Sequence, residues 1–385
     1  MNRKSATAAT SSDLAPVHSR GSELAHSMVV PRGSQRAPRS LSQHAAALRP
    51  ARLPRETPPR GLALFCPFKS GINPHADAVQ AESVEWACRL GLVESDAQRA
   101  KLRQSQIARL EALVFHAASR EVLQVAANWT TLFCLLDDHV EREALGPLDM
   151  AAYLTRVLAG FRGLAAPLDD ALSRAFFDLR CSLLALAGGA WVERFGVQLE
   201  ALFCSYIWEE INREKGLRPS QQTYRKMRVD TIGLRPQFLF GELAADVELP
   251  SELRTRPELV ALEEITSRAV GWANDIFTCD KELHDGEVHN LVLVLMDEER
   301  LSLAEARCRV AAAHDEEVRN FLSIEARLPD LGAANEAVRS YVLMLRCWIR
   351  GHLDWSQETG RYAPGPSFGA QELRAVKQRV ASRRA

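Results

Sequence analysis

The sequence predicts an all-α protein whose helices form one large bundle. Three observations lead to this fold class. The chain has 385 residues, 46% of them hydrophobic and 25% charged, which is enough apolar material for a core that surrounds a cavity. From residue 62 onward, apolar residues recur at spacings of three and four, the period of an amphipathic helix. The alternation of apolar and polar residues that is typical of strands is almost absent there.

Residues 1–60 differ from the rest of the chain. They are rich in Ser, Ala, Arg and Pro, they show no sustained periodicity, and they close with Pro50, Pro54, Pro58 and Pro59. Because such a composition buries little apolar surface, we expect a disordered extension before a helical domain at 61–385. Its arginines leave a targeting peptide or contact with an anionic partner open, but a solvated tail is the favoured interpretation.

The expected helices follow one another with short Pro, Gly or Asp breaks between them. They cover residues 77–90, 96–118, 122–139, 149–159, 168–187, 191–214, 220–231, 257–282, 302–323 and 333–353. Residues 291–295 form a short apolar run with the length of a strand, but their helical neighbours favour a helix. We find no internal repeat, which argues against a tandem protein with two sites.

Charge and cysteine content argue against some classes of function. The formal net charge of −1 gives no global case for binding nucleic acid. The eight cysteines are scattered singly without a CxxC pair, which indicates reduced thiols of a cytoplasmic protein rather than a zinc site. No stretch approaches the roughly 20 apolar residues of a membrane-spanning helix, and no signal segment opens the chain. We therefore expect a soluble intracellular protein.

The first candidate site is an acidic cluster at the end of the helix predicted at 122–139. Asp137, Asp138 and Glu141 stand where an anion faces the negative end of the helix dipole, so a helix rarely places carboxylates there without a function. Asp137 and Glu141 are four residues apart and can aim oxygen atoms at one point. Such oxygen ligands suit Mg2+. For this motif alone, a solvated acidic helix end explains the pattern equally well.

The second candidate site lies in the helix predicted at 257–282. Asn274, Thr278 and Glu282 are spaced by four residues and share one stripe of the helix surface. An amide oxygen, a hydroxyl and a carboxylate on one stripe form a chelating set for a hard cation. Lys281 lies next to Glu282, where its ammonium group can bind the same anion that the metal binds. The two acidic sets together favour a metal site over two incidental helix ends.

These residues together resemble the class I terpene synthases. Asp137-Asp-x-x-Glu141 looks like their aspartate-rich motif, and Asn274-Asp-x-x-Thr278-x-x-x-Glu282, about 135 residues further on, matches their second metal motif at every defined position. The resemblance implies a class I terpenoid synthase bundle around a central apolar cavity. It also implies three Mg2+ ions that hold the diphosphate of a prenyl substrate between the two motifs.

Five further residues are assigned by the same resemblance. The family carries an arginine that senses the diphosphate about 46 residues before the second motif, and that position is Arg228 here. Thr231 and Ile232 then stand where a helix breaks, with the Ile232 carbonyl directed into the cavity. Arg361 and Tyr362 are similar to the Arg-Tyr pair that closes over the diphosphate in bacterial members. The resemblance covers about residues 62–363.

The cavity wall has to shield a carbocation from water and stabilise it. An aromatic face does so by about 0.5 to 2 kcal/mol. Phe133 is the aromatic residue we favour, because it lies one helical turn before Asp137. The weaker candidates, for which core packing is the better explanation, are Phe65, Phe68, Trp129, Phe238, Trp272 and Trp355.

The sequence thus predicts magnesium-dependent ionisation and cyclisation of a linear prenyl diphosphate. Farnesyl diphosphate is the favoured substrate, because it is the commonest one among the enzymes that this chain resembles, and the product would be a sesquiterpene hydrocarbon or alcohol. Geranyl, 2-methylgeranyl and geranylgeranyl diphosphate stay open, as does a homodimer. A chain-elongating synthase would show a pair of DDxxD motifs, and a class II cyclase would show DxDD. The alternative from another class is a non-catalytic helical binding protein.

Overall fold

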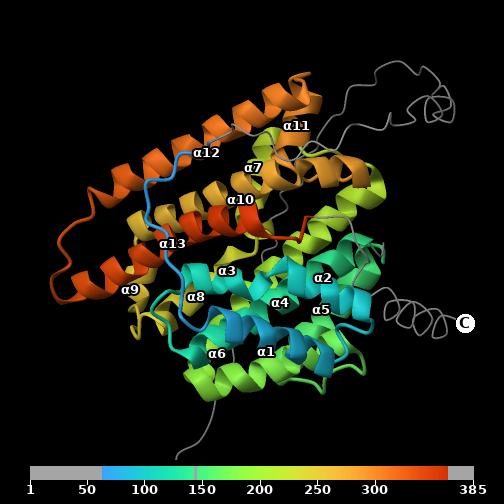
Figure 1. Cartoon of the computed structure of the whole chain (residues 1–385), viewed down its shortest axis with the longest axis vertical. Helices are drawn as coiled ribbons and strands as arrows, with labels where there is room; N and C mark the ends of the chain where they lie inside the picture. The colour runs from blue at the N-terminus through green and yellow to red at the C-terminus, as the bar shows by residue number, and fades with distance from the viewer. Residues whose placement is uncertain (1–62, 143–144, 363–385) are drawn as a thin grey trace, which may run out of the picture. The chain divides into compact units, whose positions relative to one another are not determined.

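The computed structural model describes residues 63–142 and 145–362, with only the backbone of Glu141 and Arg142. The regular elements of this part of the chain are helices, so the predicted all-α class is confirmed (Figure 1). They are α1 (Ala76–Arg89), α2 (Asp96–Ser105), α3 (Ile107–Val114), α4 (Arg120–Arg142), α5 (Pro147–Phe161), α6 (Ala171–Lys215), α7 (Gln221–Thr231), α8 (Leu234–Ala244), α9 (Ser251–Arg254), α10 (Pro257–Asp285), α11 (Leu291–Glu298), α12 (Leu303–Glu325), the short 3-10 helix η2 (Gly332–Ala334) and α13 (Asn335–Glu358). The extension predicted at 1–60 lies outside the described residues.

Most predicted helices are present, and the apolar run at 291–295 belongs to α11 as expected. The helix predicted at 96–118 is instead two helices, because Gln106 adopts the left-handed conformation at φ 46° and ends α2. The helices predicted at 168–187 and 191–214 join into α6, which is kinked at Gly188. Helix α8 is absent from the prediction. Pro236 lies in its first turn, where a proline is tolerated because those backbone N–H groups have no partner within the helix.

Side-chain caps define where several helices begin. The hydroxyl of Ser220 accepts a hydrogen bond from the Thr223 backbone N–H at the start of α7. The side chain of Asn290 accepts one from the Val292 N–H at the start of α11. Each cap satisfies a donor that the helix leaves unpaired, which stabilises a helix by about 1 kcal/mol. These two caps fix the starts of α7 and α11, both of which pack against α10.

Helix α10 is central to the bundle. It packs against α12, α13 and α7, while α4 packs against α3, α1 and α6. Figure 1 shows α10 beside α12 and α13 in one half of the bundle, with α1 to α6 in the other half. The core between them is made of buried Leu, Val and aromatic side chains from both halves.

A cluster of aromatic rings joins α4, α6 and α8. Trp129 packs edge to face on Phe195 with 5.1 Å between the ring centroids, and Phe195 also contacts Trp191 and Phe240. All four side chains are buried. Because such ring pairs add about 0.5 to 1.5 kcal/mol to the gain from burial, this cluster holds α4 firmly against its neighbours.

A buried polar cluster joins α3, α4 and α8. Thr130 Oγ1 donates a hydrogen bond to Glu111 Oε1 at 2.6 Å, and Gln237 Nε2 donates to Thr130 Oγ1 at 2.5 Å. Glu111 is fully buried, and this burial raises its pKa to about 8 although the hydrogen bond from Thr130 acts in the opposite direction. The protonated form of Glu111 therefore predominates at neutral pH.

Helix α6 is long and apolar enough to cross a membrane by length and composition, alone among the described helices. This is weak support for a span, because the core helix of a soluble protein passes the same test. Phe176, Phe195 and Phe203 of α6 are buried in the core of the bundle.

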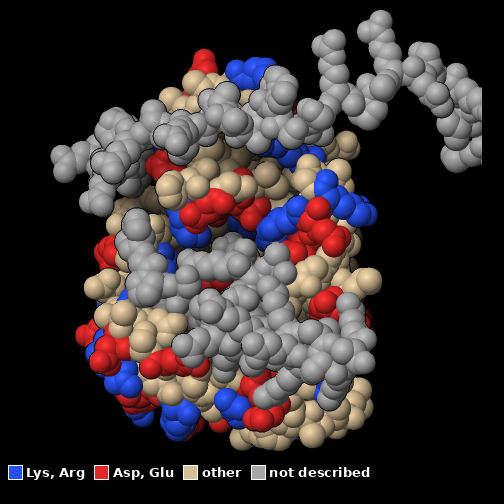
Figure 2. All heavy atoms as spheres, turned by 90° about the vertical axis from the view of Figure 1, so that its right-hand side faces the viewer, with Lys and Arg blue, Asp and Glu red and all other residues tan. Residues whose placement is uncertain are grey.

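The visible surface carries charges of both signs. On the face turned to the viewer in Figure 2, acidic and basic side chains are mixed over the part formed by described residues. This mixture agrees with the formal net charge of −1.

Candidate active site

The described residues enclose a pocket between α4, α7, α8, α10 and α13. Its empty volume, with the open mouth included, is about 890 Å³. The favoured site residues whose side chains are described all line this pocket: Phe133, Asp137, Asp138, Arg228, Thr231, Ile232, Asn274, Thr278, Lys281, Glu282, Arg361 and Tyr362. Of the weaker aromatic candidates, Trp355 alone is among its lining residues. The side chain of Glu141 lies outside the described part of the chain. Residues about 225 positions apart in the sequence therefore meet at one site.

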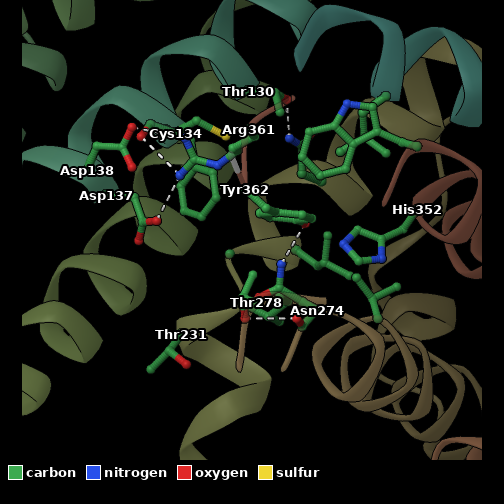
Figure 3. A pocket seen from close by; sticks show the side chains of 18 of the residues that line it. Thr130, Cys134, Asp137, Asp138, Thr231, Asn274, Thr278, His352, Arg361 and Tyr362 are labelled. Atoms are coloured by element: carbon green, nitrogen blue, oxygen red, sulfur yellow. Dashed lines mark hydrogen bonds and ion pairs between the residues drawn. The ribbon is translucent and has the colours of Figure 1, made fainter. Parts of the chain in front are cut away.

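The first acidic motif is held by an arginine from the far end of the chain. Arg361 lies 3.2 Å from Asp137 Oδ2 and 3.1 Å from Asp138 Oδ2, and it also donates to the Cys134 carbonyl at 3.4 Å (Figure 3). Burial raises the pKa of Asp137, and the adjacent Asp138 raises it further, while Arg361 lowers it. Arg361 thus neutralises part of the negative charge that α4 collects at its C-terminus.

The second motif presents its three side chains on one stripe of α10. Asn274 Nδ2 donates to the Tyr362 hydroxyl at 3.2 Å, and Thr278 Oγ1 donates to the Asn274 carbonyl at 2.9 Å. Glu282 Oε2 accepts a hydrogen bond of 2.7 Å from Asn290. Burial and the negative charge of Asp275 raise the pKa of Glu282 to about 7, so a positive charge nearby would favour its ionised form.

Arg228 lies directly beside the second motif. Its Nη2 is 2.8 Å from Asp275 Oδ1 and 2.8 Å from Asn274 Oδ1, and its Nη1 is 3.4 Å from Thr231 Oγ1. The Arg228 side chain is almost completely buried. Burial alone would lower its pKa, but the nearby carboxylates, Asp275 above all, raise it above the ordinary value. A permanently charged guanidinium therefore faces the pocket next to the metal motif.

The chain breaks between α7 and α8 at the pocket wall. Ile232 ends α7, and Gly233 begins α8 in the left-handed conformation at φ 74°. Phe133 from α4 fills the space beside this break, so that a Cβ atom on Gly233 would lie 2.5 Å from the Phe133 ring. A break at this place is therefore observed. The direction of the Ile232 carbonyl stays a prediction.

The segment that carries Arg361 and Tyr362 is tied to the junction of α2 and α3. Trp355 Nε1 donates to the Gln106 carbonyl at 2.9 Å, Thr359 Oγ1 donates to the Ser105 carbonyl at 2.6 Å, and the Gly360 N–H donates to the Gln104 carbonyl at 2.9 Å. The Gln104 and Ser105 carbonyls have no partner within a helix because the left-handed residue Gln106 interrupts it, while the Gln106 carbonyl also accepts from the Arg109 N–H. The irregular junction, which the sequence did not reveal, thus positions Arg361.

The second motif is organised by three residues that the sequence did not single out, namely Tyr224, Leu291 and Asn290. Tyr224 donates from its hydroxyl to Asp275 Oδ2 at 3.0 Å, and the Leu291 N–H donates to the same oxygen at 2.9 Å. Asn290 donates to the Asp275 carbonyl at 2.8 Å as well as to Glu282. Asp275 was visible inside the motif, but no sequence pattern connects Tyr224 or Asn290 to it. All three are buried.

The donor set fits a divalent metal that takes further ligands from water and phosphate. Among the described residues, no three His, Cys, Asp or Glu side chains gather closely enough to hold an ion by themselves. The oxygen donors are instead divided between α4 and α10 and include the amide of Asn274 and the hydroxyl of Thr278. Hard oxygen ligands in an incomplete set are the usual arrangement for Mg2+ with a bound phosphate.

The fold and the pocket define an all-α enzyme with a metal-binding site built from two helices. A family model described as terpene synthase family 2, C-terminal metal binding, matches residues 128–320, which include both acidic motifs and Arg228. This chain is 35% identical to a (+)-T-muurolol synthase of Roseiflexus castenholzii over 78% of this chain and 93% of the relative. It is 30% identical to a germacrene A synthase of Nostoc punctiforme over 78% of this chain and 94% of the relative.

A solved structure is also similar to this chain. A variant of the SVS_A2 protein from ancestral sequence reconstruction matches 80% of this chain and 91% of its own, with a TM-score of 0.70 and 26% identity. The chain belongs to the bacterial class I terpene synthases, which are lyases that act on prenyl diphosphates.

Proposed function

We propose that this enzyme ionises farnesyl diphosphate with the help of three Mg2+ ions and cyclises the resulting cation to a sesquiterpene. The observation that carries the proposal is the arrangement of oxygen donors from α4 and α10, with Arg228 and Arg361, around one pocket whose wall also carries apolar side chains. Support for a C15 substrate comes from the relatives, one of which is described as cyclising (2E,6E)-farnesyl diphosphate.

The metal ions would be held by Asp137, Asp138, Glu141, Asn274, Thr278 and Glu282. When bound, they supply Lewis acid stabilisation of the departing diphosphate. Arg228, Lys281, Arg361 and Tyr362 would bind the diphosphate oxygens through charge-assisted hydrogen bonds, which are strongest while negative charge develops on the leaving group. All four residues line the pocket.

The apolar part of the pocket wall would hold the hydrocarbon chain. Phe133, Trp348 and Trp355 contribute aromatic rings to this wall, and Leu234 and Val270 contribute aliphatic side chains. An aromatic face stabilises a cation by about 0.5 to 2 kcal/mol, and an apolar wall keeps water away from it. The hydrocarbon chain of the substrate would thus fold against a surface that does not bond to the first cation and keeps water away from it.

The mixture of surface charges and the reduced cysteines are consistent with an enzyme of the cytoplasm that does not span a membrane. The eight thiols of the sequence show no pattern for a disulfide framework. A homodimer stays a prediction.

The test is to incubate the purified protein separately with geranyl, 2-methylgeranyl, farnesyl and geranylgeranyl diphosphate in the presence of Mg2+. Volatile products are then identified by gas chromatography and mass spectrometry. We expect a cyclic C15 product from farnesyl diphosphate and at least tenfold less product from the others. A main product from geranyl or 2-methylgeranyl diphosphate would favour the monoterpene-type alternative. Binding of every diphosphate without turnover would favour the non-catalytic alternative.

A further inference from the structure

The final cation of the reaction must lose a proton, and the pocket wall offers one suitable acceptor away from the metal motifs. This inference rests on the proposed function. Thr130 and Gln237 are polar and line the pocket, but Thr130 Oγ1 already donates to Glu111 and accepts from Gln237. Glu111 itself is fully buried behind Thr130. Gln237 Oε1 and Glu111 Oε2 have no hydrogen-bond partner, but an amide oxygen and a protonated carboxyl group are far weaker bases than an imidazole, so His352 is the candidate.

His352 lies on α13 and lines the pocket with 4% of its surface exposed. Figure 3 places its imidazole on the side of the pocket opposite Asp137 and Asp138. Trp348, one turn earlier on the same helix, lines the pocket beside it. A prenyl chain with its diphosphate at the acidic motifs would extend its hydrocarbon part toward this side. The imidazole therefore stands where the cyclised cation would come to rest.

Ser356 is the hydrogen-bond partner of the His352 ring. Its Oγ lies 3.5 Å from Nδ1, one turn along α13. Ser356 also makes a hydrogen bond to Tyr362. A hydroxyl can accept a hydrogen bond from Nδ1–H, and in that tautomer Nε2 carries the lone pair.

The surroundings keep His352 neutral until it is needed. Burial lowers its pKa to about 3, and the positive charge of Arg228, together with that of His314 when protonated, acts in the same direction. The imidazole thus retains its lone pair across the physiological pH range. A C–H bond next to a carbocation is far more acidic than such an imidazolium, so proton transfer to the ring is favourable.

We propose that His352 is the general base that ends the reaction and that the product is a hydrocarbon. The C–H bond next to the final cationic carbon breaks, its electron pair forms the new carbon–carbon double bond, and the proton moves to Nε2 of His352. The imidazolium returns this proton to solvent when the product leaves. Ser356 acts as a positioning residue that selects the tautomer.

The experiment compares His352→Phe with the wild-type enzyme. The phenyl ring fills the same space but has no basic nitrogen. Products are quantified by gas chromatography and mass spectrometry and divided by the diphosphate released in the same reaction. We expect the share of the wild-type hydrocarbon to fall at least fivefold, with other alkene isomers or alcohols in its place. His352→Gln, which is polar but not basic, should show the same loss, and Ser356→Ala should show a smaller one.

His314→Phe is the matched control, because His314 is a buried neutral histidine on α12 that does not line the pocket. It should keep the wild-type product profile. An unchanged profile in either His352 variant would overturn the proposal. So would a wild-type product that is an alcohol, an outcome that leaves the proposed function intact. If farnesyl diphosphate gives no product at all, the proposed function fails instead.

Discussion

Arg228 Nη2 lies 2.8 Å from Asp275 Oδ1, and both side chains are buried next to the second metal motif. Asp275 also accepts hydrogen bonds from the Tyr224 hydroxyl and the Leu291 N–H. Asp275, which belongs to the motif but is not one of its three expected metal ligands, is therefore the residue that holds Arg228 in place. Its carboxylate is buried, and removing its charge would break the buried ion pair of Arg228.

Asp275→Asn should destabilise the protein and reduce turnover. Because breaking a buried ion pair typically costs about 3 to 5 kcal/mol, we expect the free energy of unfolding in urea to fall by about 3 kcal/mol. Asp280→Asn on the same helix changes an exposed carboxylate and should cost less than about 1 kcal/mol. Equal losses in the two variants would contradict the role assigned to Asp275.

Asn290→Asp should weaken metal binding. The new carboxylate still accepts the hydrogen bond from the Val292 N–H at the start of α11, but it cannot donate to Glu282 Oε2 as Asn290 does at 2.7 Å. Loss of such a supporting contact usually reduces metal affinity by about 10- to 100-fold. The Mg2+ concentration for half-maximal activity should rise by that factor, and excess Mg2+ should restore part of the rate. A wild-type Mg2+ dependence would show that Asn290 does not orient Glu282.

Gly233→Ala should alter the pocket at the break between α7 and α8. Its φ of 74° is strained for alanine, and the added Cβ would lie 2.5 Å from the Phe133 ring. Gly216→Ala has a similar φ of 60° but nothing within 4 Å of the new Cβ. Both variants should lose about 1 kcal/mol of stability from backbone strain, measured by urea unfolding. Only Gly233→Ala should also change the product profile, since it displaces Phe133, and the same change in both variants would contradict this account.

Glu111→Gln should remove a dependence of stability on pH. The folded protein holds the Glu111 proton up to a pKa of about 8, whereas the ordinary value for the unfolded chain is 4.5. Between these values the folded state binds more protons, so wild-type stability falls as pH rises, by up to about 1.4 kcal/mol per pH unit. Below pH 4.5 this contribution is fully present. Urea unfolding from pH 5 to pH 8 should show wild type losing stability relative to the variant, and parallel curves would contradict the prediction.

The sequence predicted the metal motifs because they are local. Asp137 and Glu141, like Asn274, Thr278 and Glu282, are spaced by the helical repeat, so a helix brings them together wherever it lies in the fold. The sensing arginine and the Arg-Tyr pair were recognised only through the resemblance. The structure places all of these residues, where their side chains are described, around one pocket.

The supporting contacts could not be predicted, because they join distant segments. Nothing in the sequence connects Asn290 to Glu282 or Trp355 to the Gln106 carbonyl. The left-handed conformation of Gln106 is equally hidden, since neither glycine nor proline marks it. Helix α8 was missed because a proline usually interrupts a helical pattern, whereas Pro236 lies in the first turn, where a helix accepts it.

The most direct test of the central claim is the turnover of farnesyl diphosphate by the wild-type enzyme and by Asn274→Ala, each with Mg2+ and with excess EDTA. Released diphosphate and C15 products are measured in the same reactions, and circular dichroism checks that the variant is helical. If α4 and α10 form the metal site, the wild-type enzyme should give a cyclic C15 product with Mg2+ and lose that product in EDTA. The Asn274→Ala variant should be as helical as wild type and should react at least 100-fold more slowly. Wild-type rates in EDTA, or from Asn274→Ala with Mg2+, would contradict it.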